Sequence, residues 1–332
     1  MKRKVLKKII FGLLIFLLLF ISFFFIGSPP RAKEISWGVN FSQKHTENFG
    51  LNWQETYLAL FDDLKVKDVK LITYWDLIEQ KEGKYHFEDL DWQIKEAEKR
   101  EVKILLVIGM KTPRWPECHI PDWAENLTKI EQQERILNLI KEIVLRYQGS
   151  TSIYMWQVEN EPFFPFGECP WVDKDFLKKE IDLVKSLDNQ KRPIVISDSG
   201  EGSFWITAAQ LGDVVGTTMY KKAWFEQIGI YVYYPLPPTF YWRKIQIIKK
   251  IFDKKVICVE LQTEPWGPVL LYDLPLEEQE KTMNLTRFKD NIEFAEKTGF
   301  DQFYLWGAEW WYWMKVKQNQ PEIWLEAKKL FQ

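Results

Sequence analysis

After residue 34 the chain alternates short, almost continuously apolar runs with longer amphipathic segments, and it does so about eight times. Apolar runs of this kind are typical of parallel strands that are covered on both faces, and their alternation with helices indicates a parallel α/β fold. The predicted strands are Ile35–Asn40, Val69–Trp75, Val102–Gly109, Ile153–Glu159, Pro193–Asp198, Val214–Tyr220, Val256–Leu261 and Gln302–Trp306. We therefore expect one (β/α)8 TIM barrel domain over residues 35–332.

The segments between these runs carry the period of amphipathic helices. In Leu127–Tyr147, for example, Ile136, Ile140 and Ile143 fall on one apolar stripe. The predicted helices are Trp53–Leu64, Phe87–Arg100, Leu127–Tyr147, Asp173–Leu187, Phe204–Leu211, Pro238–Phe252, Leu276–Lys297 and Pro321–Phe331. The segments that leave the strands are longer and richer in Trp, Pro and Gly than those that enter them, which is typical of an active site at the C-terminal strand ends.

The N-terminus carries a basic segment and a long apolar run. Residues 1–8 are rich in Lys, residues 9–27 contain no charge, and residues 28–34 form a linker. The run exceeds the roughly 7–15 apolar residues of a cleavable signal and lacks a clear Ala-x-Ala site, which favours an uncleaved transmembrane signal anchor over a signal peptide. With the basic flank in the cytoplasm, the barrel would be extracytoplasmic and membrane-anchored, or secreted if the segment is cleaved.

Charge, cysteine and histidine content limit the kinds of partner, disulfide and metal site that we expect. A net charge of -2 gives no basic surface for phosphate, so nucleic acid is not an expected partner. Cys258 lies in an apolar strand, whereas Cys118 and Cys169 follow consecutive strands and could form a disulfide in an oxidising compartment. The three histidines provide no zinc spacing, so we expect neither a metal nor a cofactor.

Two predicted strands end in a carboxyl side chain. The apolar run from Ile153 leads into Asn160-Glu161-Pro162, and the run from Val256 ends at Glu260. An isolated glutamate at such a place is more often an ion-pair partner or a helix cap. Two carboxyl groups on two strand ends of one barrel, however, form the pair that cleavage of a glycosidic bond by double displacement requires.

These residues carry a family resemblance. Asn160-Glu161-Pro162 at the fourth strand and Glu260 at the seventh resemble the clan A glycoside hydrolases, which include families 5 and 42. The stretch Tyr74–Asp91 is similar to the segment that follows the second strand in family 42 and related β-glycosidases. The resemblance covers essentially the whole chain from about residue 35, and it implies a retaining β-glycosidase.

The resemblance also implies roles for individual side chains. Glu161 would be the acid/base, and Asn160 would bind the sugar 2-hydroxyl. Glu260 would be the nucleophile, Tyr220 would hold it by a hydrogen bond, and Trp306 would form the floor of a sugar subsite. A separation of about 5–5.5 Å between the carboxyl groups would favour retention.

Other candidates lie around the predicted barrel mouth. Glu264 and Glu309 fall beyond the strand tips, where we expect contact with sugar hydroxyls rather than a nucleophilic role. The 17 tryptophans include Trp75 and Trp266 in this region, and flat indole faces suit the apolar faces of sugar rings. We therefore add these four residues to the predicted substrate-binding set.

The pattern departs from the clan in its basic residues. Many enzymes of the clan carry an Arg near the second strand and a His near the third or fourth strand, and neither has a clear counterpart at these positions here. Lys111, Arg114 and His119 could substitute for them or bind a carboxylated sugar. The segment Ala223–Tyr241 fits no barrel element, and it is either a lid over the cleft or a surface near the membrane.

The sequence thus predicts a membrane-anchored, retaining β-glycoside hydrolase that acts on an extracytoplasmic oligo- or polysaccharide. A transglycosylase would use the same covalent intermediate with a sugar acceptor. A non-catalytic carbohydrate-binding envelope protein on a degenerate barrel is the alternative from another class, since fold alone does not set function. The expected partners are a carbohydrate and, through residues 9–27, the membrane.

Overall fold

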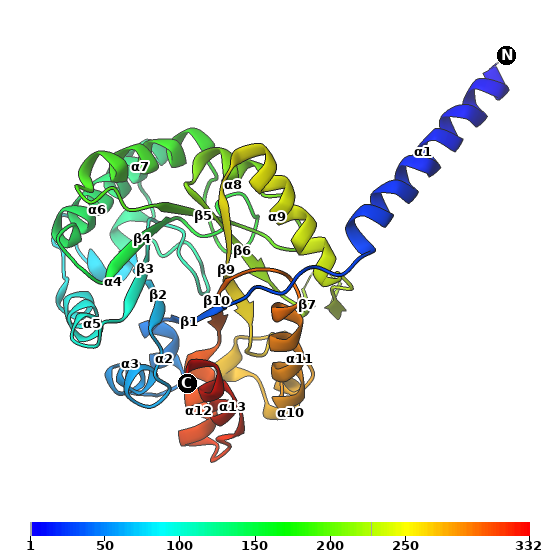
Figure 1. The fold of residues 1–332 in the computed structure, drawn as a ribbon. Helices are drawn as coiled ribbons and strands as arrows, with labels where there is room; N and C mark the ends of the chain where they lie inside the picture. The colour runs from blue at the N-terminus through cyan, green and yellow to red at the C-terminus, as the bar shows by residue number, and fades with distance from the viewer. Residues whose placement is uncertain (1, 227) are drawn as a thin grey trace.

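A closed barrel of eight parallel strands forms the centre of the computed structural model, which describes residues 2–226 and 228–332 (Figure 1). The strands are β1 (Ser36–Phe41), β2 (Asp68–Ile72), β3 (Lys103–Ile108), β4 (Ile153–Val158), β5 (Ile194–Asp198), β6 (Val214–Met219), β9 (Lys255–Gln262) and β10 (Gln302–Trp306). They pair in this order, and β10 closes onto β1. The predicted barrel is confirmed, with every predicted strand in place.

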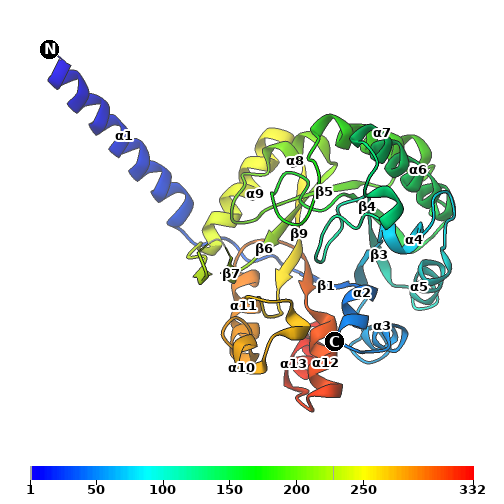
Figure 2. The ribbon, with the colours of Figure 1, turned by 180° about the vertical axis from the view of Figure 1, so that it is seen from behind.

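Helices surround the barrel (Figures 1 and 2). The main ones are α3 (Trp53–Asp62), α5 (Glu88–Glu98), α6 (Lys129–Tyr147), α7 (Lys174–Leu187), α8 (Ile206–Leu211), α9 (Pro238–Phe252), α11 (Leu285–Glu296) and α13 (Glu322–Lys328). Shorter helical segments are α2 (Gln43–Asn48), α4 (Trp75–Ile78), α10 (Leu276–Gln279), and the 3-10 turns Asp122–Ala124, Leu271–Asp273 and Lys329–Phe331. An additional helix, α12 (Ala308–Lys317), follows β10 and was not predicted.

One predicted helix is broken. Residues 276–297 form α10 and α11, separated at Asn284, whose side-chain oxygen accepts a hydrogen bond from the Arg287 amide at 3.0 Å. Asparagine favours this N-cap position over a helix interior, because its side chain satisfies an otherwise unpaired amide of the first turn. The apolar periodicity of the sequence continues across this position, so it did not predict that a second helix begins after Asn284.

The segment Ala223–Tyr241 contains an antiparallel hairpin and the start of a helix. Strands β7 (Lys222–Phe225) and β8 (Ile230–Tyr233) pair with each other and not with the barrel. Proline at the first position of α9 then begins the helix, where its missing amide costs nothing. Gln227, within this segment, and Met1, within the predicted basic segment, lie outside the described residues.

The N-terminal helix α1 (Lys2–Phe25) projects away from the barrel (Figures 1 and 2). Its stretch Val5–Phe25 is long and apolar enough to cross a membrane, and it is almost entirely exposed. This agrees with a signal sequence or a membrane anchor at the predicted place. The linker that follows leads into β1.

Helix α6 offers a test of the core. Ile140 is fully buried, whereas Ile130 in the same helix is 69% exposed. We expect Ile140→Ala to lower the free energy of unfolding by about 2–5 kcal/mol, because it removes buried methylenes and leaves a cavity. Ile130→Ala should change it by less than about 0.5 kcal/mol. Denaturant unfolding of the fragment from residue 31 measures both, and equal effects would contradict the packing of α6.

Candidate active site

Glu260 lies in the barrel interior, on β9 and before its last residue, Gln262. The side chain is 3% exposed. One carboxyl oxygen accepts a hydrogen bond from Lys70 Nζ at 2.9 Å, and the other accepts one from Tyr220 Oη at 3.0 Å. Tyr220, placed one residue after β6, thus makes the contact that the resemblance implies. Glu260 is held by one cationic and one neutral donor.

Lys70 is a site residue that the sequence analysis missed. It lies on β2 and is fully buried. The sequence did contain a sign of this role, because Lys70 is a charged residue inside the apolar run Val69-Lys70-Leu71. A lysine is almost never fully buried without a partner, so a lysine in a buried strand indicates an opposite charge nearby. Lys70 provides a cation on the second strand, where the clan pattern led us to look for an arginine.

Glu161 follows β4 through a sharp change of backbone direction. Glu159 and Glu161 have φ angles of 58° and 41°, a conformation that is uncommon for residues other than glycine. The Glu161 amide donates to Ser197 Oγ at 2.8 Å, and its carboxyl Oε1 accepts from Thr218 Oγ1 at 3.3 Å. Contacts from β5 and β6 therefore hold this residue at the inner face of the barrel mouth.

Strand β6 connects the two carboxyl groups. Thr218 is the register partner of Glu260 on β9, and its hydroxyl contacts Glu161. Burial raises the pKa of Glu161 well above its usual value, and the negative charges of Glu260 and Glu117 raise it further. Glu161 therefore keeps its proton to a higher pH than an ordinary glutamate does.

Glu117 is a third carboxyl group in the site and was not predicted. It lies in the loop after β3 and is 5% exposed. Its carboxylate accepts from Asn160 Nδ2 at 3.2 Å, while Asn160 Oδ1 accepts from Gln157 Nε2 at 3.0 Å. Burial raises the pKa of Glu117 to about 8, against the opposing charge of Lys111. Because both ends of the Asn160 amide are bonded, its orientation is fixed.

Arg114 forms ion pairs with the two other candidate glutamates, Glu264 and Glu309. It donates to Glu264 and, through Nη2 at 3.1 Å, to Glu309. Burial opposes ionisation of Glu264, but the Arg114 charge and His45 outweigh it and lower its pKa to about 2. Glu309 also accepts from the Ser42 amide at 2.6 Å. Both glutamates are thus occupied in an ion-pair cluster, an environment unlike that of Glu260.

The other basic side chains of the β3 loop are also occupied. Lys111 Nζ donates to the carbonyls of Glu161 and Phe164, at 3.1 and 2.8 Å. His119 is 1% exposed, and burial, with the nearby charge of Lys44, lowers its pKa to about 3. His119 is therefore neutral, and neither side chain presents a free charge to a carboxylated sugar.

A row of aromatic side chains leads away from Tyr220. Tyr220 lies 5.5 Å from Trp266, Trp266 lies 5.5 Å from Phe166, and Phe166 lies 5.9 Å from Trp115, measured between ring centroids. The sequence analysis proposed Trp266 for the substrate-binding set and did not identify Phe166. The Cys118–Cys169 disulfide joins the β3 and β4 loops, which carry Trp115 and Phe166.

Trp306 and Trp75 differ in access. The Arg114 guanidinium lies 3.9 Å from the Trp306 ring centroid, so only the opposite face or the ring edge remains for a sugar. The buried Trp306 indole nitrogen has no hydrogen-bond partner among the described residues. Trp75 is fully buried, bonded to Glu79 and packed against Trp123. Its place in the predicted substrate-binding set was therefore wrong.

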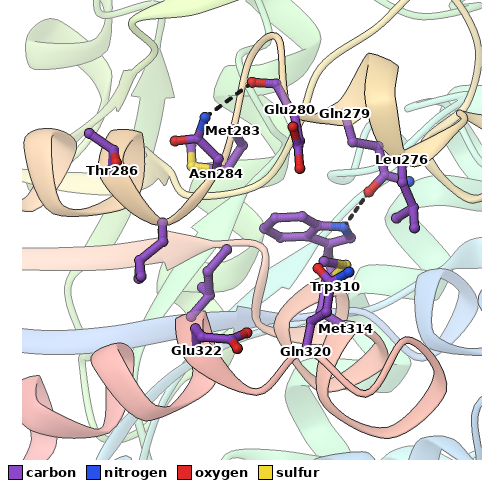
Figure 3. A pocket seen from close by; sticks show the side chains of 12 residues that line it. Leu276, Gln279, Glu280, Met283, Asn284, Thr286, Trp310, Met314, Gln320 and Glu322 are labelled. Atoms are coloured by element: carbon purple, nitrogen blue, oxygen red, sulfur yellow. Dashed lines mark hydrogen bonds between the residues drawn. The ribbon is translucent and has the colours of Figure 1, made fainter.

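Two cavities lie outside this centre. One, of about 300 Å³, lies between α10–α11 and α12–α13 and is crossed by the hydrogen bond from Trp310 to Gln279 (Figure 3). It contains neither Glu161 nor Glu260. The other, of about 400 Å³, opens between the loops that follow β4 and β5, and its lining includes Phe164. The second cavity adjoins the loop that carries Glu161.

Comparisons with known proteins agree with this geometry. The model of glycosyl hydrolase family 10 matches residues 39–178, from β1 through Glu161 into α7. A search of curated protein sequences finds no match. The sequence match therefore covers the half of the barrel that carries Lys70, Glu117 and Glu161.

Solved structures show the same fold at low identity. Xylanase 10B from Thermotoga maritima matches with a TM-score of 0.56 and 15% identity over 82% of this chain and 83% of that one. A family 10 endo-β-1,4-xylanase from Gloeophyllum trabeum matches with a TM-score of 0.56 and 16% identity over 92% and 98%. A β-galactosidase from Halorubrum lacusprofundi matches with a TM-score of 0.54 and 14% identity over 82% and 52%, so this chain spans about half of its length. Over residues 39–178 the chain is similar to glycosyl hydrolase family 10, and its barrel has the fold of these solved enzymes, which agrees with a retaining enzyme that acts on O-glycosidic bonds.

Proposed function

We propose that the enzyme hydrolyses a neutral β-linked oligo- or polysaccharide, with Glu161 as acid/base and Glu260 as nucleophile. The observation that carries this assignment is the position of β6 between them. Thr218 on this strand contacts Glu161, and Tyr220, just after it, bonds to Glu260. Contacts from one short segment therefore reach both carboxyl groups, which supports their assignment as a pair.

The two environments support different roles in a double displacement. In the first step Glu260 attacks the anomeric carbon, while Glu161 transfers its proton to the leaving oxygen. The resulting glycosyl ester on Glu260 is then attacked by water, which gives a proton to the Glu161 carboxylate. Two inversions at one carbon retain its configuration, and Glu161 ends the cycle protonated.

Asn160 and Trp306 support binding of the sugar at the reacting centre. The Asn160 amide nitrogen has two hydrogens, and one of them is used by Glu117. The other is available for the sugar 2-hydroxyl, an interaction that strengthens at the transition state. The unpaired indole N–H of Trp306 supplies a second donor for a sugar hydroxyl.

The charges around the centre favour a neutral substrate. Arg114 is neutralised by two glutamates, and Lys111 is bonded to backbone carbonyls. An anionic sugar would therefore meet buried carboxyl groups without a free cation, which is electrostatically costly. Together with the family 10 match and the two xylanases of similar fold, this makes β-1,4-xylan the first polymer to test.

The row of aromatic rings favours an extended substrate and also admits a sugar acceptor. Trp266, Phe166 and Trp115 lead away from the nucleophile and offer stacking faces. A sugar held there could displace Glu260 in place of water, which is transglycosylation. We further propose that α1 remains as a membrane anchor, which places this chemistry outside the cytoplasm.

Substitution of the two carboxyl groups tests the assignment. On xylan and xylo-oligosaccharides, Glu161→Gln and Glu260→Gln should each lower kcat/KM by about a thousandfold or more, equivalent to roughly 4 kcal/mol of transition-state stabilisation. With an aryl β-xyloside whose leaving group needs no proton, Glu161→Gln should retain a fast first step, whereas Glu260→Gln should not.

The matched control is Glu125→Gln, because Glu125 is exposed. It should behave as the unchanged enzyme. Full activity in both Glu161→Gln and Glu260→Gln would overturn the assignment. If the unchanged protein bound these substrates but cleaved none of them, the non-catalytic carbohydrate-binding role would be favoured.

Trapping the covalent intermediate tests the nucleophile and the stereochemistry together. A 2-deoxy-2-fluoro β-glycoside of a cleaved sugar should inactivate the enzyme, and mass spectrometry should find the adduct on Glu260. Proton NMR of early product should show the β-anomer. An adduct on Glu264 or Glu309 would move the nucleophile to the Arg114 cluster, and an α-anomer as first product would exclude retention.

The pH profile tests the third carboxyl group. Glu161 must start protonated, so kcat/KM falls as pH rises through its raised pKa. Glu117→Gln removes one negative charge that raises this pKa, so the alkaline limb should move to lower pH, while the new amide oxygen can still accept from Asn160. Glu125→Gln should leave the limb in place, and an unmoved limb in Glu117→Gln would contradict the coupling.

A further inference from the structure

The end of α1 is packed onto the barrel. Phe24 is 5% exposed, and its ring centroid lies 5.6 Å from those of both Phe204 and Phe240. The carbonyl of Gly27 accepts a hydrogen bond from Thr239 Oγ1 at 2.7 Å. This joint combines a buried aromatic contact with a backbone anchor, so the helix is attached rather than loosely tethered.

The joint lies at the catalytic end of the barrel. Phe204 follows β5, and Phe240 lies in the first turn of α9, where the chain has just left the region above β6. In a β/α barrel, helices that follow strands begin at the end where the strands finish. Figures 1 and 2 show α1 leaving the molecule beside α9 and β7.

The length of the helix leaves little space between a bilayer and the barrel. Val5–Phe25 contains 21 residues, which at about 1.5 Å each span roughly 30 Å, the thickness of a hydrocarbon core. The whole stretch is needed to cross, so the membrane surface must lie next to Phe24. At that level the Arg243 guanidinium lies 4.8 Å from the Phe23 ring and 4.5 Å from the Trp242 ring, an association of basic and aromatic groups that is typical of the interface.

The β7–β8 hairpin presents an apolar tip beside this joint. Phe225 and Ile230 are register partners and are 41% and 50% exposed, and Ile228 is 62% exposed. Strand β8 ends at Tyr233, shortly before α9 begins. An apolar cluster of this kind on an isolated surface element marks a contact with a partner or a membrane.

The hairpin is fixed against a neighbouring helix and not over the cleft. Lys222 Nζ donates to the carbonyl of Lys281 at 2.8 Å, and Tyr231 Oη donates to Glu278 of α10. Both partners belong to the segment around α10. These contacts favour a fixed projection over a lid that would close on Glu161 and Glu260.

We propose that the barrel rests on the bilayer, with Phe225, Ile228 and Ile230 at the depth of the lipid headgroups beside α1. The inference rests on retention of α1 as an anchor and is independent of the sugar specificity. Two contacts, the helix and the hairpin tip, restrict rotation of the barrel about the helix axis. The cleft would then open close to the membrane surface and act on glycans held there.

Cysteine labelling tests this arrangement in the full-length protein. The single cysteine outside the disulfide, Cys258, is buried, so an introduced surface thiol can be labelled selectively. Ile230→Cys and, as a matched control, Ile130→Cys on α6 carry an environment-sensitive NBD fluorophore in vesicles of phosphatidylcholine and phosphatidylglycerol. Lipids with a nitroxide near the headgroup serve as quenchers.

The label at position 230 should shift to shorter wavelength and lose at least half of its emission to the quencher lipid. The label at position 130 should keep the spectrum of a water-exposed probe. Equal behaviour of both labels would overturn the proposal. A blue shift at position 230 that depends on protein concentration in detergent and not on quencher lipid would assign the tip to a second copy of the chain.

N-terminal sequencing of the membrane-bound protein provides the second readout. A chain that begins after Gly27 would remove the anchor and overturn the inference. Xylan hydrolysis by the same preparation is unaffected by that outcome, so failure of the membrane contact and failure of the proposed enzymatic function are distinguishable.

Discussion

The pairing of Lys70 with Glu260 is the interaction on which the arrangement of the site depends. These residues come from β2 and β9, and they are 190 positions apart in the sequence. Either charge alone would be costly inside the barrel, since removal of one partner of a buried ion pair typically costs about 3–5 kcal/mol. Only a closed barrel brings the two strands to face each other, so the same closure that forms the core also holds Glu260 beside Lys70 in the barrel interior.

The difference between the two carboxyl groups follows from their neighbours. Glu260 has a lysine at 2.9 Å, whereas Glu161 has a threonine hydroxyl and two other carboxyl groups in its surroundings. Burial and the neighbouring negative charges raise the pKa of Glu161. A retaining mechanism needs this asymmetry, because one group must begin as a nucleophile and the other as an acid.

Strand periodicity predicted most of the fold, and it drew attention to Glu161 and Glu260 because strand ends in a barrel converge. The choice of Glu161 over Asn160, and the roles proposed for Asn160 and Tyr220, came from the family resemblance. Lys70 and Glu117 were missed, because the first contact crosses the barrel and the second lies in a loop without periodicity.

Two other misjudgements have local causes. Trp75 was assigned to the substrate because it follows a strand, but its indole packs against Trp123 and bonds to Glu79. The break before α11 depends on one capping contact of Asn284, which an apolar period cannot reveal. In both cases a short-range contact, which leaves no periodic signal in the sequence, decides the outcome.

The contact between α1 and the barrel is connected to Glu260 by a chain of direct contacts. Phe240 packs against Phe24, and the next residue, Tyr241, donates to Glu201 at 2.8 Å. The same Glu201 oxygen accepts the Tyr220 amide at 2.8 Å, and Tyr220 donates to Glu260. Helix α9 therefore contacts α1 through Phe240 and supports Tyr220, which bonds to Glu260, through Tyr241. A displacement of α9 would alter both sets of contacts, so the attachment of α1 and the position of Glu260 are constrained by the same helix.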